Sequence, residues 1–588
     1  MRFNCISLVL SLLLLLFSCT GDYQKTVTIL ETTDVHGEIF PYDFIEKRAT
    51  ETSMASVVTY LNNLRENGVT TLLLDNGDNL QGQPVEYFYN FIDTLSPHIN
   101  SSVMNYMGYE AATVGNHDIE AGHKVYDRLS KEYDFPLLAA NAVDTRTGEP
   151  YFDPYVIIEK NGLRIAVFGL ITPYIPNWLP DVLYSGIEFK DMVTTAEKWM
   201  PVIREQNPDI VIGLFHSGCE ENEGSNTGES YLAENASSSV AYNVPGFDII
   251  FCGHDHRAKK EKIVNRSGDT VLIIDGGSHS RFLGRADITF TRNKRGGKIK
   301  RTISGSLVEM DTYLPDDEFL DKFSASREAV ARYVDTRLGE VSETMSVRES
   351  YFGPSAFMDL IHRVQIEVSG AEISFAAPLS FDVQINKGPV TVSDMFKLYR
   401  FENMLYTISL TGDEVTRYLE FSYSGWLNTM KSADDNLLLF RTDDSGKPVM
   451  SDGRAYLKNI YYNFDSAFGI NYTVDVSKPP GSRVSIISMA DGAPFKKDNN
   501  YKVAVNSYRA NGGGGHLIAG AGLTEAELKN RYIGSTDKDL RFYIMDYIMK
   551  TKNIIPSFTD NWKIIPEQLA ERARKFDYDL LFGTDVKQ

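Results

Sequence analysis

Short apolar runs bounded by turn residues dominate the first half of this chain. TVTILE, TTLLLD, ATVG, PLLAA, RIAVFGL, DIVIGLF, DIIFCG and VLIID all fall between Thr26 and Val308. Runs that are apolar throughout, rather than alternating, are typical of strands buried on both faces of a parallel sheet. Stretches with helical spacing lie between several of them; in SMASVVTYLNNLREN the apolar residues Met54, Val57, Val58, Leu61 and Leu64 fall on one face. This alternation predicts an α/β domain with a largely parallel sheet over residues 26–308.

A second domain is expected, because 588 residues exceed what one hydrophobic core supports. PDDEFLDKFSASREAVARYVDTRLG (315–339) is predicted to be one amphipathic helix that ends at Gly339, within a linker over 309–339. Mixed helical and strand signals predict a domain over 340–555, followed by a C-terminal tail over 556–588. The basic stretch TRNKRGGKIKR (291–301) is expected to be a solvated hairpin or loop at the edge of the first domain.

The N-terminus has the pattern of an export signal. Arg2 precedes an apolar run from Ile6 to Phe17 that is too short to span a bilayer comfortably. Leu16-Phe17-Ser18-Cys19 is similar to the cleavage box of bacterial lipoproteins, which makes residues 1–18 the expected leader and Cys19 the lipid-bearing residue. Ordinary signal cleavage is the alternative. We therefore expect a periplasmic or surface lipoprotein of a bacterial envelope, whose only membrane contact is its lipid anchor.

Charge and cysteine content restrict the partners. A formal net charge of −20 disfavours a nucleic-acid polymer, because binding one requires lysines and arginines that neutralise phosphates. A small phosphorylated substrate held by metal ions remains compatible, since bound ions supply their own positive charge. After the leader only Cys219 and Cys252 remain, too few for a disulfide framework, and the sequence does not decide whether they pair.

Polar residues able to bind metal ions directly follow five of the strand-like runs. Asp34 and His36 follow TVTILE, Asp78 follows TTLLL, Asn116 and His117 follow ATV, His216 and Ser217 follow DIVIGLF, and His254 and His256 follow DIIFCG. Ligands gather at the carboxyl ends of strands in open α/β sheets, so these clusters should meet in one crevice. Imidazole and carboxylate groups together fit Zn, Mn or Fe better than Mg or Ca.

The spacing within these clusters favours a pair of divalent ions. Ions in two-metal hydrolases lie roughly 3.5–4 Å apart and share a ligand, and Asp78 is the natural bridge because Gly77 permits a tight turn. Asp-x-His and His-x-His place alternate side chains on one side of an extended segment, which suits paired ligands. By contrast, His123 and His279 have no matching partner and are expected to be structural or solvated, and Cys252 to be buried packing.

In this order, DVHG, GDNLQG, GNHD, HSG and GHDH resemble the calcineurin-like metallophosphoesterases, and the second domain resembles the C-terminal domain of the 5'-nucleotidase superfamily. FGINYTVDVSKPPGSR and NSYRANGGGG are most similar to bacterial 2',3'-cyclic-nucleotide 2'-phosphodiesterases/3'-nucleotidases. The resemblance implies an N-terminal αββα sandwich, a C-terminal α/β domain, and an exported two-metal phosphohydrolase that releases nucleoside and phosphate. A 5'-nucleotidase or nucleotide-sugar hydrolase is the alternative within this class. A surface lipoprotein that binds nucleotides without hydrolysing them is the alternative from another class.

The resemblance also implies a role for each motif. One ion would be held by Asp34, His36, Asp78 and His256, and the other by Asp78, Asn116, His216 and His254. The family often has Gln where His256 stands, and His keeps ligand capacity there. His117 would protonate the leaving alkoxide and stabilise charge on the phosphoryl group. Family members commonly carry Asp three residues after that histidine to orient it; Glu120 stands here, which leaves the geometry of the pair open.

In the second domain the resemblance implies a nucleobase stacked between Phe401 and Tyr508 and contacted by Asn403, with Arg348 in VRESYFG on a substrate phosphate. Two departures bear on the substrate. SFAAPLSFD (374–382) has neither the glycines nor the phosphate-binding arginine of 5'-nucleotidases, and Gly514 replaces the acid that holds the ribose hydroxyls. A cyclic or 3'-phosphate ester tolerates both losses better than a 5'-phosphate does.

Overall fold

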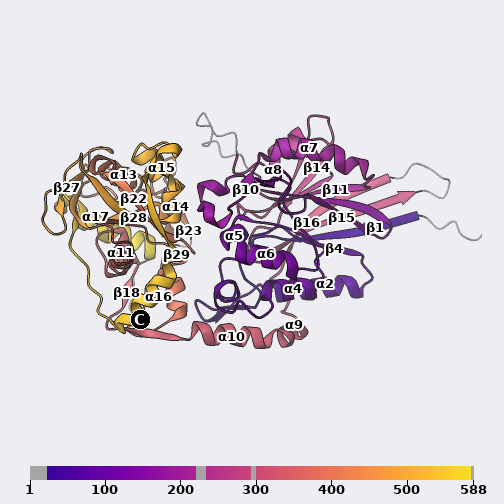
Figure 1. Cartoon of the computed structure of the whole chain (residues 1–588), viewed down its shortest axis with the longest axis horizontal. Helices are drawn as coiled ribbons and strands as arrows, with labels where there is room; N and C mark the ends of the chain where they lie inside the picture. The colour runs from indigo at the N-terminus through magenta and orange to yellow at the C-terminus, as the bar shows by residue number, and fades with distance from the viewer. Residues whose placement is uncertain (1–22, 220–232, 293–299, 452, 584–588) are drawn as a thin grey trace, which may run out of the picture. The chain divides into compact units, whose positions relative to one another are not determined.

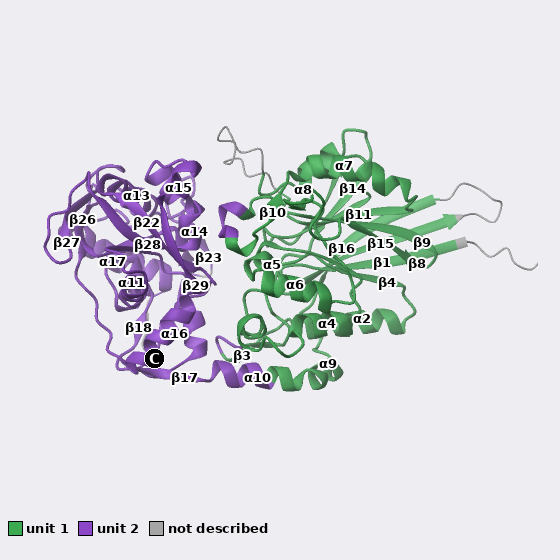
Figure 2. Ribbon diagram, viewed as in Figure 1, with its two compact units in different colours: residues 1–43, 47–175, 182–327 green, residues 44–46, 176–181, 328–588 purple. Residues whose placement is uncertain are grey.

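The computed structural model describes residues 23–219, 233–292, 300–451 and 453–583 (Figure 1). The chain divides into two compact units, coloured separately in Figure 2. The first comprises Met1–Asp43, Lys47–Ile175 and Val182–Arg327, and the second Phe44–Glu46, Pro176–Asp181 and Glu328–Gln588. The expected leader and Cys19 lie outside the described residues. Within the described ranges, no helix is both long and apolar enough to cross a membrane.

Two six-stranded sheets form the first unit. In order, one contains β16 (Lys300–Glu309), β15 (Phe282–Arg292), β1 (Tyr23–Thr32), β4 (Thr71–Asp75), β5 (Ala111–Thr113) and β6 (Leu137–Leu138). The other contains β13 (Lys259–Val264), β14 (Thr270–Asp275), β12 (Ile249–Cys252), β11 (Ile210–His216), β9 (Leu163–Ile171) and β8 (Tyr155–Lys160). Strands β1, β4, β5 and β6 run parallel, as do β9, β11, β12 and β14, so the predicted parallel core is confirmed.

Alternate residues of the central strands enter two different cores. In β9, Ile165 and Val167 face the core between the sheets, whereas Ala166 and Phe168 pack on the helix side. That second core includes α7 (Met192–Glu205) and α8 (Ser237–Asn243), while α2 (Met54–Glu66) lies on the opposite side of the unit (Figure 1). Burial of both strand faces explains the uninterrupted apolar runs, and the layering confirms the predicted αββα sandwich.

Connecting segments of this unit contain shorter elements. The helices are α3 (Pro84–Tyr87), α4 (Ile99–Met107), α5 (Asn116–Glu120) and α6 (His123–Glu132). The short strand pairs are β2 (Tyr42–Asp43) with β3 (Arg48–Ala49), and β7 (Ala142–Asp144) with β10 (Ile187–Phe189). The predicted basic hairpin is partly visible: its flanks are the antiparallel partners β15 and β16, and residues 293–299 between them lie outside the described ranges.

The second unit is built on a five-stranded mixed sheet. Its order is β25 (Ser466–Phe468), β19 (Ile373–Ala376), β28 (Asn500–Asn506), β22 (Met404–Thr411) and β29 (Tyr532–Asp539). Three-stranded sheets contain β27 (Val484–Met489), β26 (Ile470–Asp475) and β31 (Trp562–Ile565), and β21 (Gly388–Thr391), β17 (Arg337–Val341) and β30 (Asn553–Ile554). The helices include α11 (Ala356–Ser369), α12 (Val392–Leu398), α13 (Gly412–Trp426), α14 (Ser507–Ala510), α15 (Glu525–Arg531), α16 (Leu540–Thr551) and α17 (Glu567–Phe582).

The single helix predicted over 315–339 is wrong. The segment forms α9 (Asp317–Lys322) and α10 (Ser324–Val334), separated at Phe323, whose φ of −102° and ψ of 12° leave the helical range. From Arg337 the chain is strand β17. A Cβ at Gly339 would lie 2.8 Å from the Lys552 carbonyl oxygen, so this glycine allows a close approach of two backbones and does not end a helix.

Residues 556–588 were predicted to be a tail, and their described part, up to Gly583, is instead an integral part of the second unit. Strand β31 pairs in parallel with β26, and Trp562 and Ile564 join the core of that unit. Leu581 and Phe582 at the end of α17 are buried in the same core. The segment therefore supplies a strand and a helix to the fold.

Candidate active site

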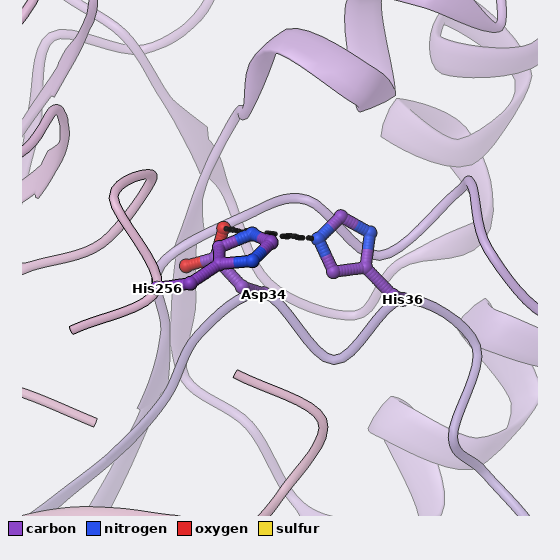
Figure 3. A group of neighbouring side chains, drawn as sticks. All are labelled: Asp34, His36 and His256. Atoms are coloured by element: carbon purple, nitrogen blue, oxygen red, sulfur yellow. Dashed lines mark hydrogen bonds and ion pairs between the residues drawn. The ribbon is translucent and has the colours of Figure 1, made fainter. Parts of the chain in front are cut away.

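The five motifs begin at the carboxyl ends of parallel strands, as predicted: β1, β4 and β5 in one sheet, β11 and β12 in the other. There the structure brings the predicted ligands into two groups. In each group, one candidate ligand atom per residue lies within 4.8 Å of the others: Asp34, His36 and His256 form the first group, and Asp78, His216 and His254 the second. Figure 3 shows the first group, whose three side chains point toward one another.

In the first group, two imidazole nitrogens and one carboxylate oxygen lie close together. His36 Nε2 lies 3.0 Å from His256 Nε2, and His256 Nε2 lies 3.2 Å from Asp34 Oδ1 (Figure 3). Asp34 Oδ1 is buried and accepts no hydrogen bond from the residues described. A buried carboxylate oxygen without a donor, facing two imidazole nitrogens, fits a divalent cation of the Zn, Mn or Fe type.

The second group gathers around Asn116. His216 Nε2 lies 3.1 Å from Asn116 Oδ1 and 3.2 Å from Asp78 Oδ2. His254 Nδ1 lies 2.8 Å from the same amide oxygen. These four residues therefore offer two imidazole nitrogens, one carboxylate oxygen and one amide oxygen, a donor set that also fits such an ion.

Unusual backbone geometry aims these ligands. Asp34, His36, Asp78, His254 and His256 all have positive φ, between 49° and 80°. For residues other than glycine this conformation costs ~1–3 kcal/mol each and is concentrated at functional sites. Backbone bonds hold the two loops together, since the Asp34 N–H donates to the Gly77 carbonyl (2.9 Å) and the His36 N–H to the Asp78 carbonyl (3.1 Å).

Asp118 is a positioning residue that the motif analysis missed. Its carboxylate accepts the backbone N–H groups of Asp78, Asn79, Leu80 and Gly115 at 2.8 to 3.1 Å. It thereby joins the loop after β4 to the start of α5. The sequence carried a signal for this role, because an acid three residues after a helix N-cap can accept the backbone N–H of the N-cap residue, here Gly115.

The electrostatics favour the protonation states that metal ligands need at Asp34, Asp78 and His36, and oppose the neutral form at His216. Burial raises the pKa of Asp78, but His216 and His117 outweigh it and hold the pKa well below the usual value. Burial likewise opposes ionisation of Asp34, yet the nearby His256 and His216 rings lower its pKa to about 2. Burial lowers the pKa of His36 to about 3. Burial opposes protonation of His216, but Asp78 raises its pKa to about 9, so an incoming ion displaces a proton there.

His117 lies beside both groups without belonging to either. Its Nδ1 is 2.5 Å from Glu120 Oε2, and its backbone N–H donates to Asp78 Oδ1 at 2.7 Å. The His117 ring lies 5.4 Å from that of His36. With Nδ1 on the Glu120 carboxylate, Nε2 is the ring atom that can carry a proton to a substrate. The longer glutamate thus reaches the histidine that it was expected to orient.

Changing Glu120 to Gln should reduce turnover by about 10- to 100-fold, since outer partners of a functional imidazole typically contribute that much. The amide can donate as well as accept, so it no longer selects the tautomer with hydrogen on Nδ1. Steady-state kinetics across pH should show a lower kcat and a shifted acidic or basic limb. Glu149→Gln, at an exposed glutamate of the same unit, is the matched control. An unchanged kcat and pH profile in Glu120→Gln would contradict the orienting role.

The two histidines that were expected to lie outside the site, His123 and His279, differ in their surroundings. His123 is satisfied by Asp127 (3.3 Å) and by the Ser185 carbonyl (2.9 Å), as a structural residue should be. His279 instead borders the site: its ring lies 5.3 Å from that of His36, and its backbone N–H donates to the Asp34 carbonyl. Its position at the end of β14, beside β12, was the signal that could have found it. Cys219 and Cys252 are buried free thiols.

In the second unit, two of the predicted substrate segments meet at one end of a strand pair. Phe401 and Asn403 precede β22, Tyr508 follows β28, and Leu405 pairs with Asn506 across these strands. The Ser507 hydroxyl donates to Asn403 Oδ1 at 3.4 Å, and both aromatic rings are half-buried. Arg348 is already engaged, because its Nε donates to Asp382 at 2.5 Å and its guanidinium lies 4.8 Å from the centre of the Phe582 ring.

Comparisons with known proteins agree with this architecture. Residues 27–258 match the calcineurin-like phosphoesterase family, and residues 334–520 match the 5'-nucleotidase C-terminal domain. These two domains define a metal-dependent phosphoric ester hydrolase. The chain belongs to the calcineurin-like metallophosphoesterases of the 5'-nucleotidase superfamily.

Relatives span most of the chain at low identity. The 2',3'-cyclic-nucleotide 2'-phosphodiesterase/3'-nucleotidase of Haemophilus influenzae is 24% identical over 621 residues, covering 93% of this chain and 88% of that protein. The trifunctional nucleotide phosphoesterase YfkN of Bacillus subtilis is 26% identical over 92% of this chain, which spans only 39% of that longer protein. The structure of a Thermus thermophilus 5'-nucleotidase precursor matches 92% of this chain and 100% of its own, with a TM-score of 0.60 and 20% identity, which supports the fold.

Proposed function

We propose that this chain is an exported two-metal phosphohydrolase of nucleotides, acting as a 2',3'-cyclic-nucleotide 2'-phosphodiesterase and 3'-nucleotidase. The observation that carries the proposal is the convergence of two ligand groups with a histidine, His117, that is held by Glu120 and anchored through its backbone to Asp78. Relatives with this activity in their names match over more than nine-tenths of the chain, which supports the same assignment.

One ion would be held by Asp34, His36 and His256, and the other would be held by Asn116, His216 and His254. Asp78 would bind both ions. Two divalent ions bound there would act as Lewis acids on a phosphoryl group and neutralise charge that develops on it. His117 Nε2 delivers a proton to the departing alkoxide oxygen, and Glu120 stabilises the imidazolium that precedes this transfer. Asp118 holds the loop that carries Asp78 against the start of α5.

For the nucleoside, we propose stacking on Phe401 and Tyr508 with a polar contact to Asn403, because stacking accepts any base. A side chain at Gly513 would lie 2.5 Å from the Tyr508 ring, so the glycine-rich segment after Tyr508 is shaped around that ring. Arg348 is left out of the proposed pocket, since Asp382 already neutralises its guanidinium. The missing arginine in 374–382 and Gly514 support a cyclic or 3'-phosphate over a 5'-phosphate.

The proposal places the enzyme in a bacterial envelope, periplasmic or at the surface. It rests on the leader-like residues 1–18 and on the lipoprotein-type sequence that ends at Cys19. An exported nucleotidase acts on extracytoplasmic nucleotides and releases nucleoside and phosphate.

The test is phosphate release from 2',3'-cyclic AMP, 3'-AMP and 5'-AMP by purified protein supplied with Mn²⁺ or Zn²⁺. For the cyclic substrate, the 3'-AMP intermediate is followed by chromatography. We expect kcat/KM for the cyclic and 3' substrates to exceed that for 5'-AMP by about tenfold or more. Preference for 5'-AMP would favour the alternative hydrolases. Nucleotide binding by the metal-loaded protein without hydrolysis would favour a binding lipoprotein.

A further inference from the structure

Three of the four ligand histidines, His36, His216 and His254, have a second partner on the ring nitrogen that faces away from the ligand group. His36 Nδ1 lies 3.0 Å from the Gln81 carbonyl oxygen, and His216 Nδ1 lies 2.7 Å from that of Asn76. A carbonyl oxygen can only accept, so each ring keeps its proton on Nδ1 and presents the Nε2 lone pair to the ligand group.

In His254 the two ring nitrogens exchange these roles. Its Nδ1 lies inside the second group, 2.8 Å from Asn116 Oδ1, while its Nε2 lies 3.1 Å from Glu234 Oε1. The backbone position from which the His254 ring projects is fixed, because His254 has a φ of 80° and its N–H donates to Asp34 Oδ2 at 3.0 Å. Its outward partner is thus a side-chain carboxylate, which a substitution can remove without altering the main chain.

Glu234 is itself held in place by the turn that follows His216. Its backbone carbonyl accepts hydrogen bonds from Thr172 Oγ1 (2.9 Å) and Ser217 Oγ (2.8 Å), and both hydroxyl-bearing residues are buried. The next residue, Asn235, accepts the Gly218 N–H at 3.2 Å through its side chain. The turn after His216 therefore positions Glu234, which is the partner of His254. The Glu234 side chain is only 29% exposed.

We propose that Glu234 is a positioning residue of the second metal group, accepting the Nε2 proton of His254 so that the Nδ1 lone pair faces the ion. Without that acceptor the ring can carry its proton on Nδ1, and this tautomer cannot bind the ion through Nδ1, the nitrogen that lies inside the second group. An ionised acceptor also increases the basicity of the imidazole toward the ion. The inference rests on the proposed metal centre, but it concerns metal affinity and does not depend on which substrate is hydrolysed.

The experiment is a Co²⁺ titration of metal-free protein followed by visible absorption, comparing wild type with Glu234→Ala and Glu234→Gln. Wild type should bind two ions. In Glu234→Ala one site should keep its affinity and the other should weaken by about 10- to 100-fold, with an altered absorption band. Glu234→Gln, which keeps an uncharged acceptor, should fall between the two. Glu205→Ala, at an exposed glutamate of the same unit, should match wild type.

Wild-type affinity at both sites in Glu234→Ala and Glu234→Gln would overturn the inference. Equal weakening of both sites together with a lower unfolding temperature of the metal-free variants would also overturn it, by assigning Glu234 a purely structural role. Failure of the proposed function looks different: wild type would bind two Co²⁺ ions and hydrolyse no nucleotide. In that case the selective loss in Glu234→Ala would still support the positioning role.

Discussion

His117→Asn should lose about 10²–10⁴-fold in turnover while it keeps both metal ions, which is the usual contribution of a positioned proton donor. The side chain belongs to neither ligand group. Its backbone N–H to Asp78 Oδ1 survives any substitution, and asparagine can retain a hydrogen bond to Glu120. The variant should therefore fold and bind metal normally, and lack only a group that delivers a proton to the leaving oxygen.

The measurement combines kcat on 3'-AMP with metal content by elemental mass spectrometry. His123→Asn is the matched control: it lies on the neighbouring helix α6, is satisfied by Asp127 and the Ser185 carbonyl, and should behave as wild type. A His117→Asn enzyme within threefold of wild-type kcat would show that another group supplies the proton. Loss of metal in that variant would show that His117 is a ligand.

Asp78→Asn has the second large expected effect, a fall in turnover of about 10³-fold or more together with loss of bound metal. Asp78 Oδ1 accepts the His117 N–H, and Oδ2 faces His216. An asparagine must keep its oxygen toward the His117 N–H, so its NH₂ group would point at the ion. The substitution also removes the charge that raises the pKa of His216 to about 9, and this pKa should therefore fall.

Isothermal titration with Mn²⁺, alongside kcat, measures both consequences. The control Asp153→Asn changes an exposed acid of the same unit and should leave affinity and turnover unchanged. Full binding of two ions and wild-type turnover in Asp78→Asn would contradict the bridging role.

Local patterns in the sequence were sufficient to predict the fold of the first unit and the residues of the ligand groups. Strands such as β9 and β11 are buried on both faces, so their sequences are continuously apolar, and the ligands follow at the chain positions where parallel strands end. Each of these relations joins residues a few positions apart. They could therefore be predicted without knowing which strands pair.

What escaped prediction depends on contacts between distant residues. The chain bends at Phe323 where Phe319 and Phe323 both pack against Tyr106, more than two hundred residues earlier. Strand β31 has its partner, β26, about ninety residues before it, so its sequence alone resembles a tail. Glu234 and His279 reach the site only through the folded positions of β11, β12 and β14, and neither lies in a ligand motif.

Crystals grown with Mn²⁺ offer the most direct test of the central claim, through an anomalous difference map at the two ligand groups. Two peaks roughly 3.5–4 Å apart are predicted, one bound by Asp34, His36 and His256, the other by Asn116, His216 and His254, with Asp78 contacting both. A single peak at saturating Mn²⁺, or two peaks that Asp78 does not join, would contradict the two-metal account.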